Sequence, residues 1–362
     1  MPPSPRVVLA NLALIAASLV FALLAAELVV FRFILLPSDV PRNAFTDGVV
    51  RYAPQQTGIT RLRNEFAAPF AINAQGWNSG VGDYRLARTP GVARIAIVGD
   101  SMVEAMQVAA SASLAEQLGR RLGEAAEVYR FAISGAPLSQ YLWMIEREVA
   151  RYTPDLVVVV LIHNDFDESF RFKPGRYTSS FLKLKIEDGQ VTDEIPPTAY
   201  EPPWWDGLRF SATFRYLYYR QRACPEALCG RDVASPFQAN VDADVVARAR
   251  ADVRIATEYV FARLTRLARD AGFRLLLMMD GDRKAVYAGA DPGPLYAGGP
   301  LALNALAAEA AARNGIAFID LHARFAADWQ AHHKGFDFPH DSHWNERGHE
   351  IAAEAIAEFV RQ

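Results

Sequence analysis

The chain has 362 residues, of which 51% are hydrophobic and 22% are charged, and its formal net charge is -3. This length and apolar content allow a substantial buried core and favour one large domain with an appendage over two equal domains. The small negative charge gives no electrostatic basis for binding nucleic acid, so we expect no nucleic-acid partner.

An almost continuously apolar segment extends from Val7 to Leu36. About 20 apolar residues cross the hydrocarbon core of a bilayer, so residues 1–36 predict a single transmembrane helix that contacts membrane lipid. A cleaved signal peptide is the alternative, because Arg6 precedes the apolar run. We favour the anchor, since the run continues past Ala26 and Leu24 occupies a position where cleavage needs a small residue.

Charges near the ends of this segment bear on its orientation. Arg6 and the amino terminus favour a cytoplasmic N-terminus, which would place the rest of the chain in the periplasm of a bacterium. Arg32 and Arg42 follow the segment and leave the opposite orientation open. Glu27 and Arg32 lie near the expected interface, where both can extend their charges into water, so we assign neither a function.

The chain after the anchor has an irregular part and a regular part. Residues 37–90 are rich in Asn, Gly, Arg and aromatic residues without sustained periodicity, and we interpret them as a lead-in that packs on the main domain. Residues 91–362 form that domain, in which apolar strands alternate with helices. The expected strands are 95–98, 128–133, 156–162, 273–279 and 316–320, and the expected helices are 101–123, 139–151, 242–271, 301–314 and 350–360. This alternation predicts βαβ units and a central parallel sheet.

Residues from about 166 to 240 depart from the alternation, so we interpret them as an insertion that covers the cleft. Their aromatic clusters, such as Trp204-Trp205, favour packing over stacking on sugar rings. Cys224 and Cys229 are the only cysteines, and a local disulfide between them is favoured over metal binding, because two cysteines without a second ligand pair make a poor zinc site. Whether the two are bonded stays open.

Polar residues follow the first three strands. Ser101 follows the first strand in Gly99-Asp100-Ser101, Gly135 follows the second, and Asn164 follows the third. Carboxyl ends of parallel strands meet at one edge of a sheet, where ligands bind, so we expect these residues to gather there. Ser101, between a strand and a helix, is a candidate nucleophile, although capping the helix is the simpler role.

Asp341 and His343 lie two positions apart, shortly before the last helix. In an extended loop this spacing points both side chains the same way. An ionised aspartate beside an imidazole fixes its tautomer and stabilises the imidazolium form, which a serine nucleophile needs from its base.

A resemblance to the SGNH or GDSL hydrolase superfamily covers residues 94–362 and rests on the motifs Gly99-Asp100-Ser101, Gly135, Asn164 and Asp341-x-His343. The lead-in motif Asn73-x-x-Gly76 is similar to the upstream segment of membrane-anchored bacterial members. The resemblance implies a three-layer α/β/α fold with a flavodoxin-like parallel sheet, and neither a metal nor an organic cofactor.

The resemblance also implies a role for each motif residue. Ser101 would be the nucleophile, His343 the base and Asp341 the acid that orients it. The backbone N–H groups of Ser101 and Gly135 and the side-chain amide of Asn164 would form the oxyanion hole.

Two features depart from the usual pattern of the superfamily. His163 stands where many members have Gly, and Asp341 is two rather than three positions before His343. The run Asp341-Ser342-His343-Trp344 is similar to the Asp-x-His-Trp motif of periplasmic polysaccharide O-acetyltransferases. The acceptor of the acyl group, water or a sugar hydroxyl, therefore stays open.

The sequence as a whole predicts a membrane-anchored, extracytoplasmic serine esterase. Its substrate would be an acylated carbohydrate or another envelope ester, with acetyl as the expected group. An O-acetyltransferase with the same triad is one alternative, and a catalytically silent envelope scaffold is another. The presence of Ser101, Asp341 and His343 together argues against the scaffold.

Overall fold

The computed structural model of this chain describes residues 4–172, 177–223 and 243–362. Cys224 and Cys229 lie outside these ranges, so their pairing stays a prediction. The chain divides into two compact units, which we name the anchor unit and the sheet unit. The anchor unit comprises Met1–Val40, Ile59–Ala67 and Pro202–Arg231, and the sheet unit comprises Pro41–Gly58, Ala68–Glu201 and Asp232–Gln362.

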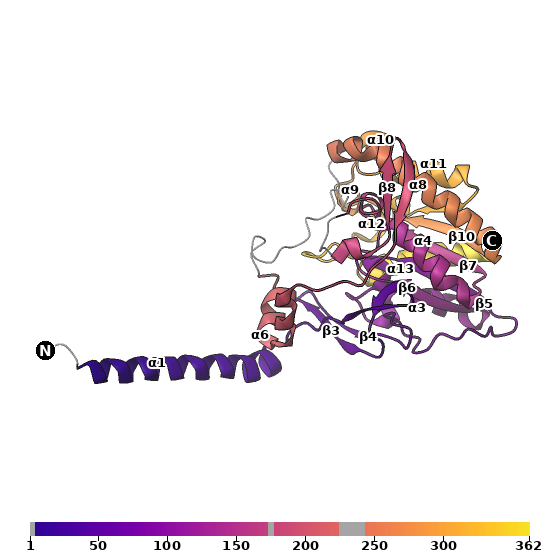
Figure 1. Ribbon diagram of the computed structural model, residues 1–362. Helices are drawn as coiled ribbons and strands as arrows, with labels where there is room; N and C mark the ends of the chain where they lie inside the picture. Colours follow the sequence, from indigo (N-terminus) through magenta and orange to yellow (C-terminus); the bar gives the residue numbers. More distant parts are fainter. Residues whose placement is uncertain (1–3, 173–176, 224–242) are drawn as a thin grey trace. The chain divides into compact units, whose positions relative to one another are not determined.

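A five-stranded sheet forms the centre of the sheet unit, and all its paired strands run parallel (Figure 1). Its strands are β5 (Ala93–Gly99), β6 (Ala126–Ala132), β7 (Leu156–Leu161), β10 (Arg274–Met279) and β11 (Ala317–Asp320). They lie in the order β11-β10-β7-β5-β6. This is the flavodoxin-like order, in which the chain changes direction across the sheet between β5 and β7. The predicted parallel sheet is confirmed.

The strand β7 illustrates why these residues form a central strand. Its sequence, Leu-Val-Val-Val-Val-Leu, is buried throughout, and its β-branched side chains suit a pleated surface packed on both faces. Successive side chains point to opposite faces, so Val157 and Val159 pack in one core whereas Val158 and Val160 pack in the other.

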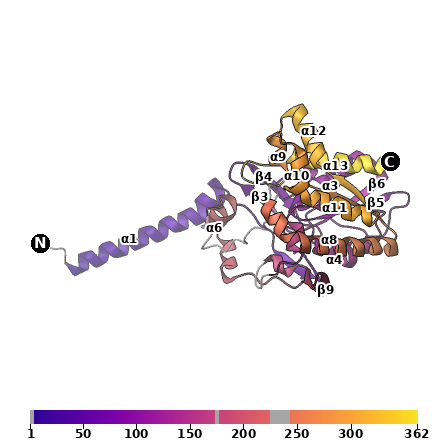
Figure 2. The ribbon, with the colours of Figure 1, turned by 90° about the horizontal axis from the view of Figure 1, so that it is seen from above.

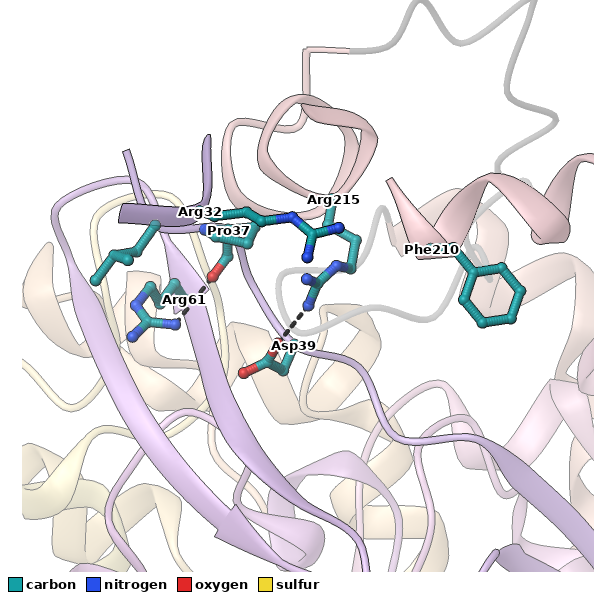
Figure 3. A pocket seen from close by; sticks show the side chains of 7 residues that line it. Arg32, Pro37, Asp39, Arg61, Phe210 and Arg215 are labelled. Carbon is teal, nitrogen blue, oxygen red and sulfur yellow. Dashed lines mark hydrogen bonds and ion pairs between the residues drawn. The ribbon is translucent and has the colours of Figure 1, made fainter. Parts of the chain in front are cut away.

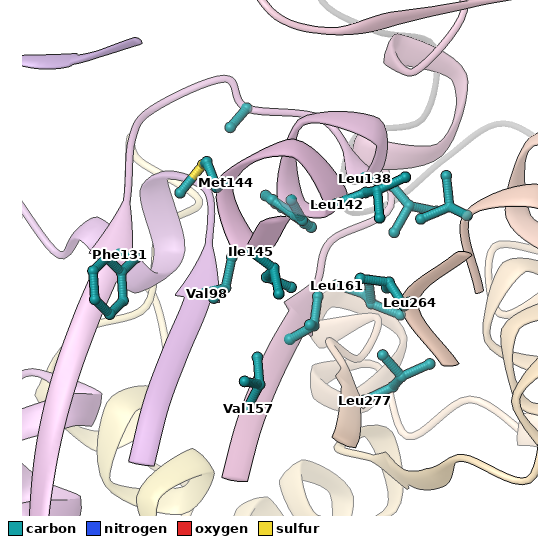
Figure 4. Packing of buried hydrophobic residues seen from close by; sticks show 14 of the residues in the cluster. Val98, Phe131, Leu138, Leu142, Met144, Ile145, Val157, Leu161, Leu264 and Leu277 are labelled. Atoms are coloured by element: carbon teal, nitrogen blue, oxygen red, sulfur yellow. The ribbon is translucent and has the colours of Figure 1, made fainter. Parts of the chain in front are cut away.

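Helices cover both faces of the sheet. One face packs against α4 (Leu138–Arg147), α8 (Ala243–Ala271) and α11 (Ala302–Arg313). The other packs against α3 (Leu114–Leu122), α12 (His322–His332) and α13 (Glu346–Arg361). Figure 2 shows the two helical layers, and Figure 4 shows side chains of α4 and α8 packed against β5, β6, β7 and β10. The sheet unit therefore has the three-layer α/β/α fold.

The helical segments differ from the expected ones in several places. The helix expected at 101–123 is broken: α2 (Ser101–Glu104) ends at Ala105, whose φ of 59° lies in the left-handed region, and α3 begins at Leu114. The last helix begins earlier than expected, because the side chain of Asn345 accepts hydrogen bonds from the N–H groups of Arg347 and Gly348. The helices α9, α10 and α12 were not expected. The remaining helices and turns of the sheet unit are α5 (Asp165–Glu168), α9 (Arg283–Tyr287), α10 (Pro292–Gly298), η2 (Ala110–Ala112), η3 (Gly123–Ala125), η4 (Val149–Tyr152) and η5 (Tyr177–Ser180).

Short hairpins supplement the main sheet. They are β1 (Asn43–Thr46) with β2 (Val49–Tyr52), β3 (Thr57–Leu62) with β4 (Phe66–Ala71), and β8 (Lys183–Glu187) with β9 (Gln190–Ile195). Beyond the second hairpin, the hydroxyl of Tyr84 donates to the carbonyl of Arg130 and accepts from its N–H group, and the ring stacks on Tyr129. This part of the lead-in occupies hydrogen-bonding groups on the edge strand β6.

The anchor unit contains the apolar helix. It begins as α1 (Pro5–Ala25) and continues as the π-helix η1 (Ala26–Ile34), and together they are long and apolar enough to cross a membrane. The unit also holds the turn η6 (Trp204–Phe210), the helix α6 (Ala212–Arg215) and the π-helix η7 (Tyr216–Arg220).

Candidate active site

Ser101 is the first residue of α2, directly after β5. Asp100 caps this helix, because its side chain accepts a hydrogen bond of 2.9 Å from the N–H group of Met102. Gly99 permits the sharp turn, since a Cβ atom at this position would lie 2.4 Å from Val103 Cγ2. The capping role therefore belongs to Asp100, and the Ser101 hydroxyl, which lies 3.3 Å from Asp100 Oδ2, also has a closer partner.

That partner is His343, which arrives on the loop before α13. His343 Nε2 lies 2.7 Å from Ser101 Oγ, and His343 Nδ1 makes a short contact with Asp341 Oδ1. The same carboxylate oxygen accepts a hydrogen bond of 2.9 Å from the backbone N–H of His343. The Asp341 side chain is 3% exposed and that of His343 is 25% exposed. A hydroxyl, an imidazole and a buried carboxylate in this series can generate a serine nucleophile.

The three residues expected to form an oxyanion hole follow adjacent strands. Gly135 follows β6 with a φ of 74°, Ser101 follows β5, and Asn164 follows β7. They lie at the carboxyl edge of the sheet, at the point where the strand order reverses, which is where open α/β sheets bind ligands. Asn164 Nδ2 is 3.4 Å from Glu168 Oε2. The role of the three residues as oxyanion donors stays a prediction.

Glu104, the last residue of α2, belongs to the site although its sequence context did not predict this. Its buried carboxylate accepts hydrogen bonds from Tyr52 Oη at 2.5 Å, from the N–H group of Ser134 at 2.9 Å and from Ser134 Oγ at 2.5 Å. Burial raises the pKa of Glu104, whereas the hydrogen bonds from Ser134 and Tyr52 lower it. Glu104 thus holds the residue directly before Gly135. Its position three residues after Ser101 on a predicted helix was the one feature of the sequence that could have indicated this role.

A second group of overlooked residues holds the loop that carries His343. Trp344 Nε1 donates to Asp280 Oδ1 at 3.0 Å, and Arg283 Nη1 donates to Asp280 Oδ2 at 2.5 Å. Arg283 Nη2 also donates to the carbonyl oxygen of Ser342 at 2.5 Å. Residues on both sides of His343 are therefore tied to the end of β10. The run Asp280-Gly281-Asp282 after a predicted strand was the available signal.

His163, which departs from the usual superfamily pattern, lies just before Asn164. Its side chain is fully buried, and neither ring nitrogen has a hydrogen-bond partner among the described residues. Burial lowers the pKa of His163, while the carboxylates of Asp280 and Asp282 raise it. The net lowering favours the neutral imidazole, so His163 adds no positive charge behind Asn164.

Several solved structures are similar to this chain at low sequence identity. The acetyl xylan esterase AlAXEase is 14% identical, with 74% of this chain and 99% of that chain covered and a TM-score of 0.41. A lipase/acylhydrolase from Enterococcus faecalis is 13% identical, with 75% and 96% covered and a TM-score of 0.39. A variant of Axe2, an acetyl-xylooligosaccharide esterase from Geobacillus Stearmophilus, is 11% identical, with 75% and 96% covered and a TM-score of 0.40.

No curated protein matches the chain. The model of the GDSL-like Lipase/Acylhydrolase family, in contrast, matches residues 97–351, which include Ser101, Gly135, Asn164, Asp341 and His343. This match spans more than half of the chain. The chain therefore belongs to the GDSL-like lipase/acylhydrolase family, and this membership implies ester hydrolase activity.

Proposed function

We propose that this protein is a membrane-anchored serine esterase that removes acyl groups, with acetyl the expected group, from a carbohydrate or another ester of the bacterial envelope. The observation that carries the proposal is the 2.7 Å contact between His343 Nε2 and Ser101 Oγ, backed by the contact of His343 Nδ1 with Asp341. Family membership supports ester hydrolysis as the reaction class.

The first half of the reaction forms an acyl-enzyme. Ser101 Oγ attacks the carbonyl carbon of the ester while His343 Nε2 accepts the hydroxyl proton. Asp341 stabilises the imidazolium that results. The N–H groups of Ser101 and Gly135 and the amide of Asn164 then donate hydrogen bonds to the oxyanion. When the bond to the alkoxy oxygen breaks, the released alcohol takes the proton from His343, and the acyl group remains on Ser101.

The second half regenerates the enzyme. A water molecule attacks the acyl carbonyl carbon, and His343 accepts one of its protons. The bond between the carbonyl carbon and Ser101 Oγ breaks, His343 returns the proton to this oxygen, and a carboxylic acid leaves. A sugar hydroxyl in place of water would give acyl transfer with the same residues.

The Asp-x-His-Trp similarity does not favour transfer in this chain. Trp344 is fully buried, and its indole N–H donates to Asp280 rather than facing a ligand. This residue supports the loop and offers no surface to an acceptor. Hydrolysis therefore remains the preferred reaction, with transfer as an outcome of the test below.

The periplasmic location belongs to the proposal as well. The helix Pro5–Ile34 is strongly apolar, and its most apolar stretch is not buried in the structure. A surface of this kind suits lipid. Arg6 ahead of it supports export of the sheet unit.

The test uses purified full-length protein in detergent. Hydrolysis of p-nitrophenyl acetate is compared with hydrolysis of longer acyl esters, and acetate release from an O-acetylated polysaccharide is followed with and without an unacetylated acceptor. We expect acetate release that does not require the acceptor. Acetyl groups that appear only on the acceptor would replace the esterase with the transferase, and inert, folded protein would favour the scaffold.

A further inference from the structure

The length of the apolar helix places its last turns at the bilayer surface. The α-helical part, Pro5–Ala25, contains 21 residues, which at about 1.5 Å per residue extend about 32 Å. This part alone matches the hydrocarbon core of a bilayer, which is about 30 Å thick. In a membrane-spanning anchor, the segment after about residue 26 therefore lies among the lipid headgroups.

Glu27 joins this part of the helix to the segment 204–220 of the anchor unit. Its carboxylate accepts hydrogen bonds from Ser211 Oγ at 2.8 Å, from the N–H of Ala212 at 2.7 Å and from the N–H of Thr213 at 3.0 Å. The ring of Phe31 also contacts that of Tyr216. Glu27 thus has a structural partner beyond the expected extension into water, and segment 204–220 is held at the headgroup level.

A positively charged pocket of about 360 Å³ opens within the anchor unit beside the end of the helix (Figure 3). Its lining residues are Arg32, Leu36, Pro37, Asp39, Arg61, Phe210 and Arg215. Three guanidinium groups and one carboxylate line the pocket, so its charge is positive. We name it the arginine pocket.

The charged groups of the arginine pocket are only partly compensated. Asp39 pairs with Arg215, and Arg61 donates to the carbonyl of Pro37 at 2.9 Å (Figure 3). Arg32 is half exposed and reaches Glu27 only at 3.7 Å, while Glu27 is already bound by the three donors above. Burial lowers the pKa of Arg61. The carboxylate of Asp39 opposes this shift, and the guanidinium groups of Arg220 and Arg215 add to it. Because arginine stays protonated in spite of such shifts, the pocket holds repulsion that a bound anion would relieve.

The segment 204–220, which contributes Phe210 to the lining of this pocket, carries exposed aromatic and apolar side chains. Trp204 is 88% exposed and Phe210 is 80% exposed, and Leu208 and Leu217 are each 46% exposed. Aromatic side chains are enriched at the membrane–water interface, where a ring reaches the apolar region beside polar headgroups. Apolar rings next to arginines match a ligand that has both an acyl part and an anionic part.

We propose that the arginine pocket binds the phosphate group of an anionic phospholipid, with Trp204 and Phe210 inserted beside its acyl chains. Guanidinium groups bind phosphate through paired N–H donors, which suits Arg32 and Arg61 in the lining of the pocket. The proposal rests on the membrane anchoring proposed above. It gives the segment 204–220 a function that is independent of ester hydrolysis.

The experiment measures lipid retention by purified full-length protein. Native mass spectrometry follows binding of phosphatidylglycerol and of phosphatidylcholine to the wild type and to the variants Arg32→Gln and Arg61→Gln. Arg254→Gln is the control, because Arg254 lies on α8 in the sheet unit and contacts Glu309 at 3.4 Å. We expect the wild type to prefer phosphatidylglycerol. Each pocket variant should reduce this preference about fivefold, the equivalent of about 1 kcal/mol per basic residue. Arg254→Gln should keep the preference of the wild type.

Two further measurements test whether the bound phosphate belongs to a lipid and whether the charge of Arg61 is what binds it. Inorganic phosphate in excess should displace little lipid, and Arg61→Lys should restore part of the preference because it keeps the charge. Displacement by inorganic phosphate would assign the pocket to a soluble anion instead, and equal retention of both lipids by the wild type would overturn the proposal. Arg32→Gln is expected to fold like the wild type, because the Arg32 side chain is 50% exposed, so a loss of binding in this variant does not reflect misfolding.

Failure of the anchor is recognised separately. Alkaline carbonate washing of membranes leaves an integral protein in the pellet and releases a peripheral one. Release of this chain would reject the proposed anchoring, whereas retention in the pellet without a lipid preference would reject only the lipid site. Ester hydrolysis by the pocket variants should equal that of the wild type.

Discussion

His343 Nε2 lies 2.7 Å from Ser101 Oγ, although 242 positions separate the two residues along the chain. The strand β5 delivers Ser101 to the carboxyl edge of the sheet, and the loop before α13 returns His343 to the same edge. Their contact, with Asp341 on the far side of the imidazole, is the geometric basis of the proposed reaction.

Replacement of Asp341 tests the orientation of the base. In Asp341→Asn the neutral carboxamide cannot stabilise an imidazolium, and its NH2 group can donate to Nδ1 and favour the wrong tautomer of His343. We therefore expect kcat for p-nitrophenyl acetate to fall on the order of 10⁴-fold with little change in KM. Asp291→Asn is the control, because Asn at this exposed position still caps α10. A loss below about tenfold would remove Asp341 from the mechanism.

Asn164→Ala tests the oxyanion hole. Loss of one donor to the oxyanion reduces kcat by about 10²- to 10³-fold, and we expect a loss in this range from steady-state kinetics. Asn314→Ala removes a comparable amide, which donates to the carbonyl of Ala310, and it should leave kcat unchanged. Unchanged kcat in both variants would show that the oxyanion is held elsewhere.

Glu104→Gln tests whether the carboxylate positions Gly135 through Ser134. A Gln side chain cannot accept all three hydrogen bonds, so we expect kcat to fall about 10- to 100-fold at nearly constant KM, in line with the loss of a hydrogen bond to a charged group. Tyr52→Phe leaves both contacts with Ser134 and should cost less. If Tyr52→Phe is as slow as Glu104→Gln, the hydrogen bond from Tyr52 rather than the contact with Ser134 carries the effect.

Glu168 makes stability depend on pH. Burial raises the pKa of Glu168 from 4.5 to about 7, although Lys183 opposes this shift. The folded protein therefore keeps a proton that the unfolded chain releases, and the free energy of unfolding falls as the pH rises between these two values. We expect this fall in the free energy of unfolding to be about 1 to 3 kcal/mol smaller in Glu168→Gln. Urea denaturation of both proteins at several pH values measures the difference. Parallel curves for wild type and variant would contradict the assignment.

Sequence patterns were sufficient for the layers of the fold. Runs such as Leu156–Leu161 are apolar and β-branched, and their alternation with helices predicted the parallel sheet. The same reasoning placed Ser101, Gly135 and Asn164 at one edge, because all three follow parallel strands. The position of Asp341 and His343 just before the last helix also predicted a loop beside this edge. The assignment of His343 as the base for Ser101 rested on the family resemblance, since nothing local shows which side chain a distant loop meets.

Contacts between distant residues were beyond the sequence patterns. Tyr52 and Glu104 are 52 positions apart, and Glu27 and Ser211 are 184 positions apart, so neither hydrogen bond leaves a periodic signal. The break after α2 was also missed, because Ala105 favours helices and its left-handed conformation is imposed by the surrounding structure. Glu27 illustrates the consequence: without Ser211 in view, extension into water was the simpler interpretation.

The most direct test of the central claim is hydrolysis of p-nitrophenyl acetate by full-length wild type, Ser101→Ala and Ser111→Ala, each with and without a serine-reactive phosphonate. Ser111 is an exposed serine and serves as the matched control. We predict that Ser101→Ala loses activity and phosphonate labelling together, that Ser111→Ala retains both, and that peptide mapping places the label on Ser101. Activity or labelling that survives in Ser101→Ala would contradict the proposed nucleophile.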